Sequence, residues 1–544
     1  MLVNTRLPGF FFVIMGVSLA ALFAVSAAPA QKKPTKYPRL VADEVLVESE
    51  QGLSIVRGRV RDREPGAPVL GSTETDAAAR RLEALSEQAI AGGFYNLAYD
   101  NRDQKHSLLP PDRFPRLATI DNSSLPGGRR ARRGVPQFIW PGYTVIGNAS
   151  LAETAGRFPR SLPRALMTGR RNPLQAIRPY TANALYVYPA HKDFNGDDLF
   201  PANWPYAIAS RGSSYSDMPI VDALVLAAAA LPAHTRRALE AASLMGPTLQ
   251  MLLRRNLTGI ETLDDYLTGA AHPVVFDGKR VDALAMVEMA STMRPEAIPT
   301  QPTLNVISET FERDSDAGGR DERLFDTPAA VARLWRSHRA QQRVVLGPGQ
   351  TSDPNGRALD YHWVLLRGDP EKVHIEPLGE RGQRAEITID WHEPEDIPPL
   401  GGARSARIEI GLIVTNGEFA SAPAIFSVSM PHHQTRIYAR GEDGARRLER
   451  IDYRAGALPS DPALDWQANW ADVLDYDAGG QLTGWWRETR IGRCRFDAQG
   501  RLNGEIVPRY ETRWRDGQRW LVATNLPVRC GGEPDRQPTA DNES

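Results

Sequence analysis

The sequence has few cysteines, only one long apolar run and almost no net charge. It contains 2 cysteines in 544 residues, and its 65 basic side chains nearly balance 66 acidic ones, for a formal net charge of −1. A balanced charge creates no overall field that would draw nucleic acid or an anionic membrane to the chain. We therefore expect no nucleic-acid partner, and no membrane contact beyond the single apolar run at the N-terminus.

That apolar run has the pattern of a secretory signal peptide. Arg6 supplies a positive charge, residues 10–25 are almost wholly apolar, and residues 28–30 read Ala-Pro-Ala, a small-x-small cleavage site. The alternative is an uncleaved anchor, because apolar character extends over residues 7–30, close to the ~20 residues that a membrane span needs. The pattern predicts a signal peptide over residues 1–30 and an exported protein, periplasmic or extracellular.

Both cysteines lie near the C-terminus. Cys494 and Cys530 have no near neighbour of metal-ligand type, and an isolated pair in an oxidising compartment predicts a disulfide. Closing this loop would stabilise the tail by roughly 3–4 kcal/mol in the chain-entropy model. The alternative is a pair of free, buried thiols.

The length predicts about three domains, at ~150 residues per domain. Residues 31–300 are expected to form an α+β domain with an irregular loop at 101–134, and residues 184–188 and 206–209 are its best strand patterns. Apolar spacing and capping residues predict helices over 76–91, 218–230, 232–244, 246–255, 262–267 and 281–293. These short apolar helices should pack against the strands as one block.

Strand patterns dominate residues 301–430. They cover 304–307, 343–346, 359–366, 373–375, 385–391, 407–415 and 424–428, with a helix expected at 327–338. Residues 352–356 read Ser-Asp-Pro-Asn-Gly, a tight-turn sequence, and lead into a strand that carries Tyr361 and Trp363 on one face. The pattern predicts a β-sandwich.

The turn at 352–356, the Tyr361–Trp363 pair and the late Asn416-Gly417 turn resemble the PKD family of immunoglobulin-like domains. In that family a Ser-x-Asp-Pro-Asp-Gly type of turn precedes a strand with a Tyr-x-Trp core pair. The resemblance covers about residues 340–430, and Asn355 and Asn416 depart mildly from it. It implies a spacer, an adhesion module or a carbohydrate-associated module, and a fold alone assigns no chemistry.

The tail, residues 431–530, contains an internal repeat. Residues 476–484 read YDAGGQLTG and residues 496–504 read FDAQGRLNG. The pattern aromatic-Asp-x-x-Gly-x-Leu predicts strand, turn and strand, and weakly resembles the tyrosine–aspartate repeats of bacterial surface proteins. We expect a small β-meander clamped by Cys494 and Cys530, followed by disorder over 531–544.

One loop has the composition of a calcium site. Asp193, Asn195, Asp197 and Asp198 place oxygen ligands around Gly196, as a hard cation requires. The helix–loop–helix calcium spacing is not met, because a glycine occupies loop position four and a tryptophan occupies position twelve. The alternative is a hydrophilic turn whose side chains bond their own backbone. Calcium is the one cofactor that the sequence suggests.

A second loop, residues 210–217, precedes a predicted helix. Arg211, Gly212, Ser213 and Ser214 could hold an anion at the helix start. A hydrolytic site would use Ser213 or Ser214 as nucleophile with Asp217 and a histidine, His272 or His191. The spacing matches neither Gly-x-Ser-x-Gly nor a phosphate loop, and the alternative is simple helix capping.

Residues 391–396 group aromatic and acidic side chains at the end of a predicted strand. Trp391, His392, Glu393, Glu395 and Asp396 could form a sugar-contacting edge. The alternative is a solvated loop.

Three functions fit these patterns. The leading hypothesis is a non-catalytic binding or structural protein of the bacterial cell envelope, with carbohydrate or other envelope proteins as partners. The alternative is a secreted hydrolase of glycans or esters, with its site near residues 210–217 and the β domain as an accessory. A calcium-dependent adhesion protein is the third.

Overall fold

The computed structural model describes residues 37–47, 53–71, 75–103, 106–126, 133–153, 160–168, 172–194, 196, 198–312, 322–397, 402–431, 433–441, 443–454, 464–465, 469–490, 492–502, 505–506, 510–515 and 518–523. The described residues all belong to one compact unit, Tyr37–Ser544. The predicted signal peptide, Cys530 and residues 531–544 lie outside the described residues.

The N-terminal region, residues 37–300, is built on a nine-stranded sheet in the order β11-β10-β9-β6-β3-β4-β1-β2-β5. Its strands are β1 (Arg39–Val47), β2 (Ser54–Arg61), β3 (Leu97–Asn101), β4 (Ala118–Ile120), β5 (Phe138–Ile139), β6 (Thr144–Asn148), β9 (Ala184–Pro189), β10 (Ile208–Ser210) and β11 (Val275–Phe276). Neighbours pair in parallel except β1 and β2. The central strands are buried almost throughout, as in parallel sheets covered on both faces. The region is therefore mixed α/β with a mostly parallel sheet.

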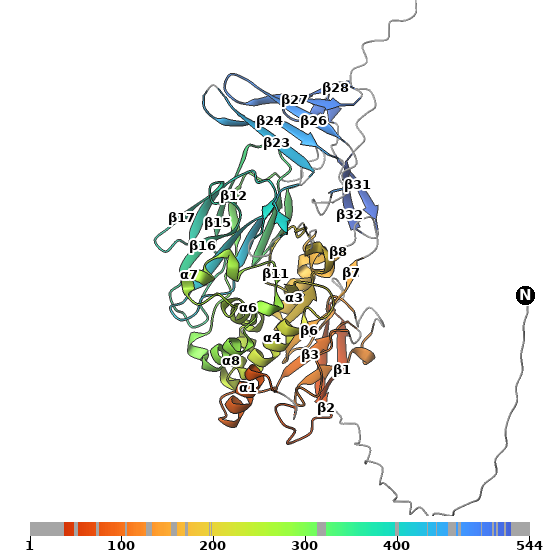
Figure 1. Cartoon of the computed structure of the whole chain (residues 1–544), viewed down its shortest axis with the longest axis vertical. Coiled ribbons are helices and arrows are strands. Elements are labelled where there is room, and N and C mark those ends of the chain that lie inside the picture. The colour runs from red at the N-terminus through yellow and green to blue at the C-terminus, as the bar shows by residue number, and fades with distance from the viewer. Residues whose placement is uncertain are drawn as a thin grey trace, which may run out of the picture. The chain divides into compact units, whose positions relative to one another are not determined.

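The predicted helical block is confirmed with shifts of a few residues. Its helices are α1 (Ala77–Glu87), α4 (Met218–Ala230), α5 (Ala233–Ala241), α6 (Met245–Arg255), α7 (Leu263–Tyr266) and α8 (Ala283–Thr292), and two more are α2 (Leu162–Leu166) and α3 (Asn172–Thr181). Carboxylates cap two of them, since Asp76 accepts from Ala79 N and Asp282 from Ala285 N. Helix α4 contacts β6, α6 and α8, as Figure 1 shows. It is the core helix of the region.

No single helix among the described residues is long and apolar enough to cross a membrane. The pair α4 and α5 passes by length and composition together, but the two are bent by 108°. Most of α4 is buried inside the protein.

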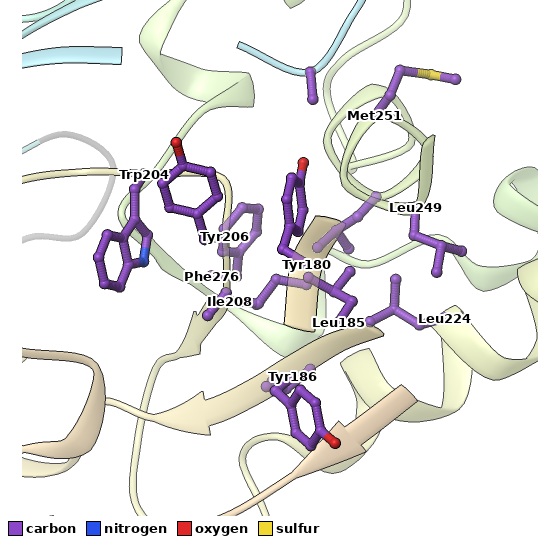
Figure 2. Packing of buried hydrophobic residues seen from close by; sticks show 14 of the residues in the cluster. Tyr180, Leu185, Tyr186, Trp204, Tyr206, Ile208, Leu224, Leu249, Met251 and Phe276 are labelled. Atoms are coloured by element: carbon purple, nitrogen blue, oxygen red, sulfur yellow. The ribbon is translucent and has the colours of Figure 1, made fainter. Parts of the chain in front are cut away.

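Aromatic side chains fill the core around β9, β10 and α6 (Figure 2). The rings of Tyr180 and Tyr206 lie 5.4 Å apart, and Trp204 lies 5.7 Å from Tyr206. Trp204 also lies 6.0 Å from Phe325, which belongs to the following β region. Tyr206 hydrogen-bonds Thr327 at 2.9 Å, so one hydrophobic core continues from the N-terminal region into the β region.

The β region, residues 301–430, contains two larger sheets. The first has the order β12 (Asn305–Glu309), β15 (Gln341–Gly347), β18 (Arg384–Asp390), β17 (Val373–Leu378); the second has the order β13 (Arg323–Thr327), β14 (Ala330–Leu334), β22 (Ala424–Ser429), β21 (Ile408–Thr415), β16 (Asp360–Arg367). All pairs are antiparallel except β14 with β22. Rings from the two sheets meet, with Trp335 5.5 Å from Trp391 and Phe311 6.2 Å from Phe426.

The helix predicted at 327–338 is wrong. Residues 330–334 form β14, which is buried along its whole length between β13 and β22. The apolar spacing that suggested a helix belongs to a strand buried on both faces, where alternation disappears. Ladder pairing on both sides satisfies its backbone and decides the conformation.

The turn at 352–356 forms as predicted. Asp353 Oδ1 accepts from the backbone amides of Asn355 and Arg357 at 2.9 and 3.1 Å, and Gly356 has φ +72°. Asp353 Oδ2 also accepts from Asn416 at 2.9 Å, which joins the two predicted turns. Tyr361 and Trp363 are only half-buried, because β16 is the edge strand, and the wholly buried tryptophan of this region is Trp335.

The tail forms a seven-stranded antiparallel sheet in chain order. It contains β23 (Gln434–Arg440), β24 (Arg446–Tyr453), β26 (Trp470–Tyr476), β27 (Leu482–Thr489), β28 (Gly492–Asp497), β29 (Arg501–Leu502) and β30 (Glu505–Ile506). Both copies of the repeat make the same turn: Asp477 Oδ1 accepts from Gln481 N, and Asp497 Oδ1 accepts from Arg501 N, each at 2.8 Å. Cys494 is buried in this sheet, while the predicted partner Cys530 lies outside the described residues, so the disulfide stays a prediction.

Gly480 is required by the first repeat turn, and replacing it with alanine should destabilise the tail. Its φ is +77°, and an added Cβ would overlap the Arg447 guanidinium. An alanine in the left-handed backbone conformation lowers the folding stability by about 1–2 kcal/mol. Urea unfolding monitored by tryptophan fluorescence would measure this loss. Gly479→Ala is the control, because a Cβ there meets only Asp477 Oδ1 at 3.4 Å. An equal loss of stability in both variants would contradict the conclusion that the turn requires Gly480.

Candidate functional site

Polar side chains collect where the central parallel strands end. Asp103 follows β3, Asn148 ends β6, and the loop at 210–217 follows β10. In open α/β sheets, ligands bind outside the carboxyl ends of the strands. We call this group of residues the carboxyl-edge cluster: Tyr99, Asn101, Asp103, Ser107, Asn148, Ser150, Ser214 and Asp217.

Asn148 is at the centre of the cluster. Its Nδ2 donates to Asp217 Oδ2 at 2.6 Å and to the Ser107 carbonyl at 2.8 Å, and its Oδ1 accepts from Tyr99 Oη at 2.8 Å. Asn101 donates to the His106 carbonyl at 2.9 Å. These bonds fix the segment after β3 against the ends of β6 and α4.

Asp217 has an unusual environment for a carboxylate. It is fully buried, and its Oδ1 has no hydrogen-bond partner. Burial raises the pKa of Asp217; the Asn148 hydrogen bond opposes this, and the charge of Asp103 adds to it. Burial also raises the pKa of Tyr99 to about 12. Asp217 therefore keeps its proton to a higher pH than an ordinary aspartate does.

Asp103 and two serines form the second part of the cluster. Ser150 Oγ donates to Asp103 Oδ2 and lies 3.1 Å from Ser214 Oγ. Ser150 and Ser214 are half-buried, whereas Asp103 is 8% exposed. This part of the cluster is nearer to solvent than Asp217.

Two aromatic side chains lie on the solvent-exposed side of the carboxyl-edge cluster, which we call its rim. Tyr215 is 60% exposed with φ +75°, a sparsely populated conformation for a residue with a side chain, and its amide donates to Ser107 Oγ at 2.7 Å. The exposed His106 ring lies 6.2 Å from the Tyr215 ring. The rim thus offers two rings next to hydroxyl, amide and carboxylate groups.

The predicted anion-binding residues are only partly brought together. Arg211 Nη1 lies 3.5 Å from Asp277 Oδ2 in a solvent-exposed pair, so it faces that carboxylate. Ser213 is exposed, and its carbonyl accepts from Ser216 N. Gly212 has φ +130°, and its carbonyl accepts from His191 N at 2.7 Å. Ser214 and Asp217 belong to the carboxyl-edge cluster; Arg211 and Ser213 do not.

His272 does not meet the serines. Its Nε2 lies 2.6 Å from the Tyr266 carbonyl, and its ring packs edge-on against Tyr266 at 4.7 Å. Ser214 Oγ lies 3.1 Å from Ser150 Oγ, whereas His272 is bonded to the Tyr266 carbonyl, so the described residues do not join His272 to Ser214. His272 is a buried packing residue.

The buried His272 should make the protein less stable in acid. Burial lowers its pKa well below the usual value, and the nearby Arg254 lowers it further. The neutral form therefore stabilises the fold fully above about pH 6.5, and this contribution is lost as pH falls toward the lower folded pKa, by at most about 1.4 kcal/mol per pH unit. His272→Gln should show a shallower acid loss in urea titrations, and parallel profiles for variant and wild type would refute it.

The predicted calcium loop is used differently in the structure. Asp193 Oδ2 accepts from Ser161 N at 2.6 Å, and its Oδ1 lies 3.6 Å from Arg164 Nη1. Asp198 pairs with Arg407 at 2.8 Å and with Arg367 at 3.2 Å, while Asn195 and Asp197 lie outside the described residues. Within the described ranges, no group of three His, Cys, Asp or Glu side chains is arranged to hold a metal ion. The two described carboxylates neutralise buried arginines.

Asp198 belongs to a buried network that joins the N-terminal region to β21. Arg407 Nε donates to Glu409 Oε1 at 2.6 Å, and Asn203 Nδ2 donates to Glu409 Oε2 at 2.8 Å. Burial opposes the charge of Arg407, but Asp198 and Glu409 outweigh it and raise its pKa. The network holds the segment at 198–203 against the β region.

Sequence reasoning singled out Ser214 and Asp217, and it did not single out the other six members of the cluster: Tyr99, Asn101, Asp103, Ser107, Asn148 and Ser150. The available signal was the pair of segments LAYDNRD and TVIGNAS, in which polar residues follow directly after apolar strands. Knowing that these strands are parallel neighbours would have placed their polar ends together.

Comparisons with known proteins give little support for a function. No family model matches the chain, and no curated protein does. Among solved structures, the chain is similar to a nucleoside hydrolase-related hypothetical protein from Saccharophagus degradans, described as associated with carbohydrate metabolism. The identity is 11%, the TM-score is 0.19, and the match covers 53% of this chain and 71% of that chain. A likeness this weak carries no functional argument.

Proposed function

We propose that the protein is an exported hydrolase that cleaves a glycosidic bond at the carboxyl-edge cluster. The observation that carries the proposal is the environment of Asp217. Its carboxyl is buried, and its pKa is raised by that burial and also by the charge of a second carboxylate, Asp103. Glycoside hydrolysis needs one carboxyl that holds a proton and one that is ionised, and environments that separate two carboxyl pKa values assign those roles.

In this proposal Asp217 is the general acid and Asp103 the ionised partner. Asp217 protonates the leaving oxygen, and Asp103 activates the attacking water or attacks the sugar carbon itself. The amide of Asn101 and the hydroxyls of Ser150 and Ser214 hydrogen-bond the sugar. A glycosidic bond fits better than an ester because the described part of the cluster contains two carboxylates and no histidine bonded to a serine.

Substrate has to reach Asp217, which is fully buried. The residues above it are Tyr215 and Ser107, joined by the Tyr215 N–Ser107 Oγ bond of 2.7 Å. Because Tyr215 has a strained φ, a movement of this turn would release backbone strain. Binding of a sugar against the Tyr215 and His106 rings would displace the turn.

The second candidate is binding without cleavage, and the complete burial of Asp217 favours it. In that case Asp217 and Asn148 shape the loop, and the exposed rim holds a sugar. In this case, too, the proposed partner is a carbohydrate or another protein of the cell envelope.

The β region and tail are proposed to be accessory modules. We propose an immunoglobulin-like sandwich over residues 301–430, for which the ring contacts between the two sheets speak. A PKD-type module at about 340–430 is proposed from the sequence resemblance and the Asp353 turn. A periplasmic or extracellular location is proposed from the leader pattern at residues 1–30.

The test is hydrolysis by the purified full chain of a panel of aryl glycosides and neutral oligosaccharides, with binding measured in parallel by calorimetry. The proposal predicts product release from at least one member of the panel. Binding to the rim without any product would support the second candidate and overturn the first. Tyr215→Ala should weaken binding in either case.

A further inference from the structure

A cavity of about 660 Å³ lies outside the carboxyl-edge cluster, between the N-terminal region and the β region. Its walls come from the edge strand β11, the end of β16, and the short hairpin of β19 (Glu395–Asp396) and β20 (Arg404–Ser405). Small-molecule sites are typically ~300–1,000 Å³ and occur preferentially at such junctions. The hairpin is fixed to the N-terminal region, because Asp198 N donates to the Arg404 carbonyl at 2.7 Å.

The floor of the cavity is apolar. Leu257, Val275 and Phe276 contribute from the N-terminal region, and Leu366 and Ile397 contribute from the β region. The Arg254 guanidinium lies 4.9 Å from the centre of the Phe276 ring and holds that ring in place. The floor can therefore take the C–H face of a ligand and offers it no hydrogen bonds.

Two of the three arginines that line the cavity are paired with carboxylates. Arg407 pairs with Asp198 and Glu409, and Arg280 donates to the Ala270 and Thr258 carbonyls at 3.2 and 3.1 Å. Arg367 pairs with Asp198, and its Nε lies 3.4 Å from Glu409 Oε1 without making a hydrogen bond. Arg407 and Arg367 are thus neutralised by carboxylates, whereas Arg280 is bonded to backbone carbonyls and keeps its charge.

The rim offers hydrogen-bond acceptors. Asp277, Asp369, Glu395 and Asp396 line it, with side chains 26%, 26%, 47% and 81% exposed. Arg211 pairs with Asp277, Arg404 with Asp396, and Lys372 with both Asp369 and Glu395, so together with the lining Arg280 four basic side chains offset four carboxylates. A carboxylate retains acceptor sites beyond one ion pair. His392 is neutral and engaged, since Nε2 accepts from Asp369 N and Nδ1 donates to the Asp390 carbonyl.

We propose that this cavity binds the end of a neutral oligosaccharide. Sugar hydroxyls donate to the rim carboxylates, and the apolar face of the ring lies on the floor of Val275, Phe276 and Ile397. An anion is disfavoured because Arg407 and Arg367 are paired and four carboxylates line the rim. A cation is disfavoured because Arg211, Lys372, Arg404 and the lining Arg280 offset the charge of those carboxylates. The site does not depend on the proposed hydrolase activity.

This site contains part of the sugar-contacting edge expected from residues 391–396. His392, Glu395 and Asp396 line the cavity. Trp391 does not contribute, because it is 4% exposed and the Arg436 guanidinium lies 3.8 Å from its ring centre.

The test is calorimetric titration of the full chain with neutral tetrasaccharides of several linkages, a glucosamine tetramer as the cationic probe, and a galacturonate tetramer as the anionic probe. Ala270 is exposed and lines the cavity, so Ala270→Trp should fill it and weaken neutral binding at least tenfold. Ala241→Trp, at an exposed position on α5 away from the cavity, is the matched control and should bind as wild type does.

A second variant avoids any question of folding. Asp396→Ala removes an acceptor that is 81% exposed and should weaken neutral binding several-fold. In both cavity variants hydrolysis at the carboxyl-edge cluster should proceed as in wild type, which separates the cavity from that cluster. Tighter binding of the cationic or anionic probe, no neutral binding at millimolar concentration, or unchanged affinity in both Ala270→Trp and Asp396→Ala would overturn the proposal.

Discussion

Replacing Asp217 with asparagine is expected to lower kcat for glycoside hydrolysis by about 10²–10⁴-fold, the usual contribution of general acid–base catalysis. Asparagine has nearly the same shape but cannot donate a carboxyl proton. An aryl glycoside with a good leaving group, which needs little protonation, should be less affected than a natural oligosaccharide. Initial rates on the two substrates measure the difference.

The matched control is Ser213→Ala, because Ser213 is exposed and lies outside the cluster. Its kcat should stay within about twofold of wild type. Equal rates for Asp217→Asn and wild type would remove Asp217 from the chemistry, and equal loss in both variants would point to a disturbed loop.

Replacing Arg407 with alanine is expected to destabilise the protein by about 3–5 kcal/mol, the cost of leaving a buried ion network without one partner. Asp198 and Glu409 are at most 1% exposed, so both carboxylates would remain buried. Without Arg407 they would have a much weaker counter-charge. Guanidinium unfolding monitored by fluorescence measures the loss.

The control is Arg57→Ala, which breaks a pair with Glu44 at 3.2 Å in which both side chains are more than half exposed. Exposed pairs of this kind contribute little, and the variant should unfold as wild type does. A small loss for Arg407→Ala would show that the network is not needed to join the two regions.

The helical block could be predicted because its signals are local. Asp76 and Asp282 cap helices, and α4 is apolar except for Asp222, so residues near in sequence determine each element. The turn at 352–356 and the two repeat turns are local for the same reason. Segment 330–334 failed because its conformation depends on β22, almost a hundred positions later in the chain.

The site could be predicted only in part, because it is assembled by strand order. Asn148 and Asp217 are 69 positions apart, and their hydrogen bond depends on β6 and β10 lying near one another in a parallel sheet. No local pattern fixes that order. The acidic loop misled for a related reason, since the partners of Asp198 are Arg367 and Arg407, far along the chain.

The most direct test of the account is the pH dependence of kcat/KM for hydrolysis by wild type and by Asn148→Ala. A general acid must be protonated, so activity should fall as pH rises through the pKa of Asp217, which burial places above its usual value. The Asn148 hydrogen bond favours the ionised carboxylate, so its removal should raise that pKa and move the alkaline limb to higher pH. An alkaline limb that stays in place, or moves to lower pH, would contradict the assignment of Asp217 as the acid.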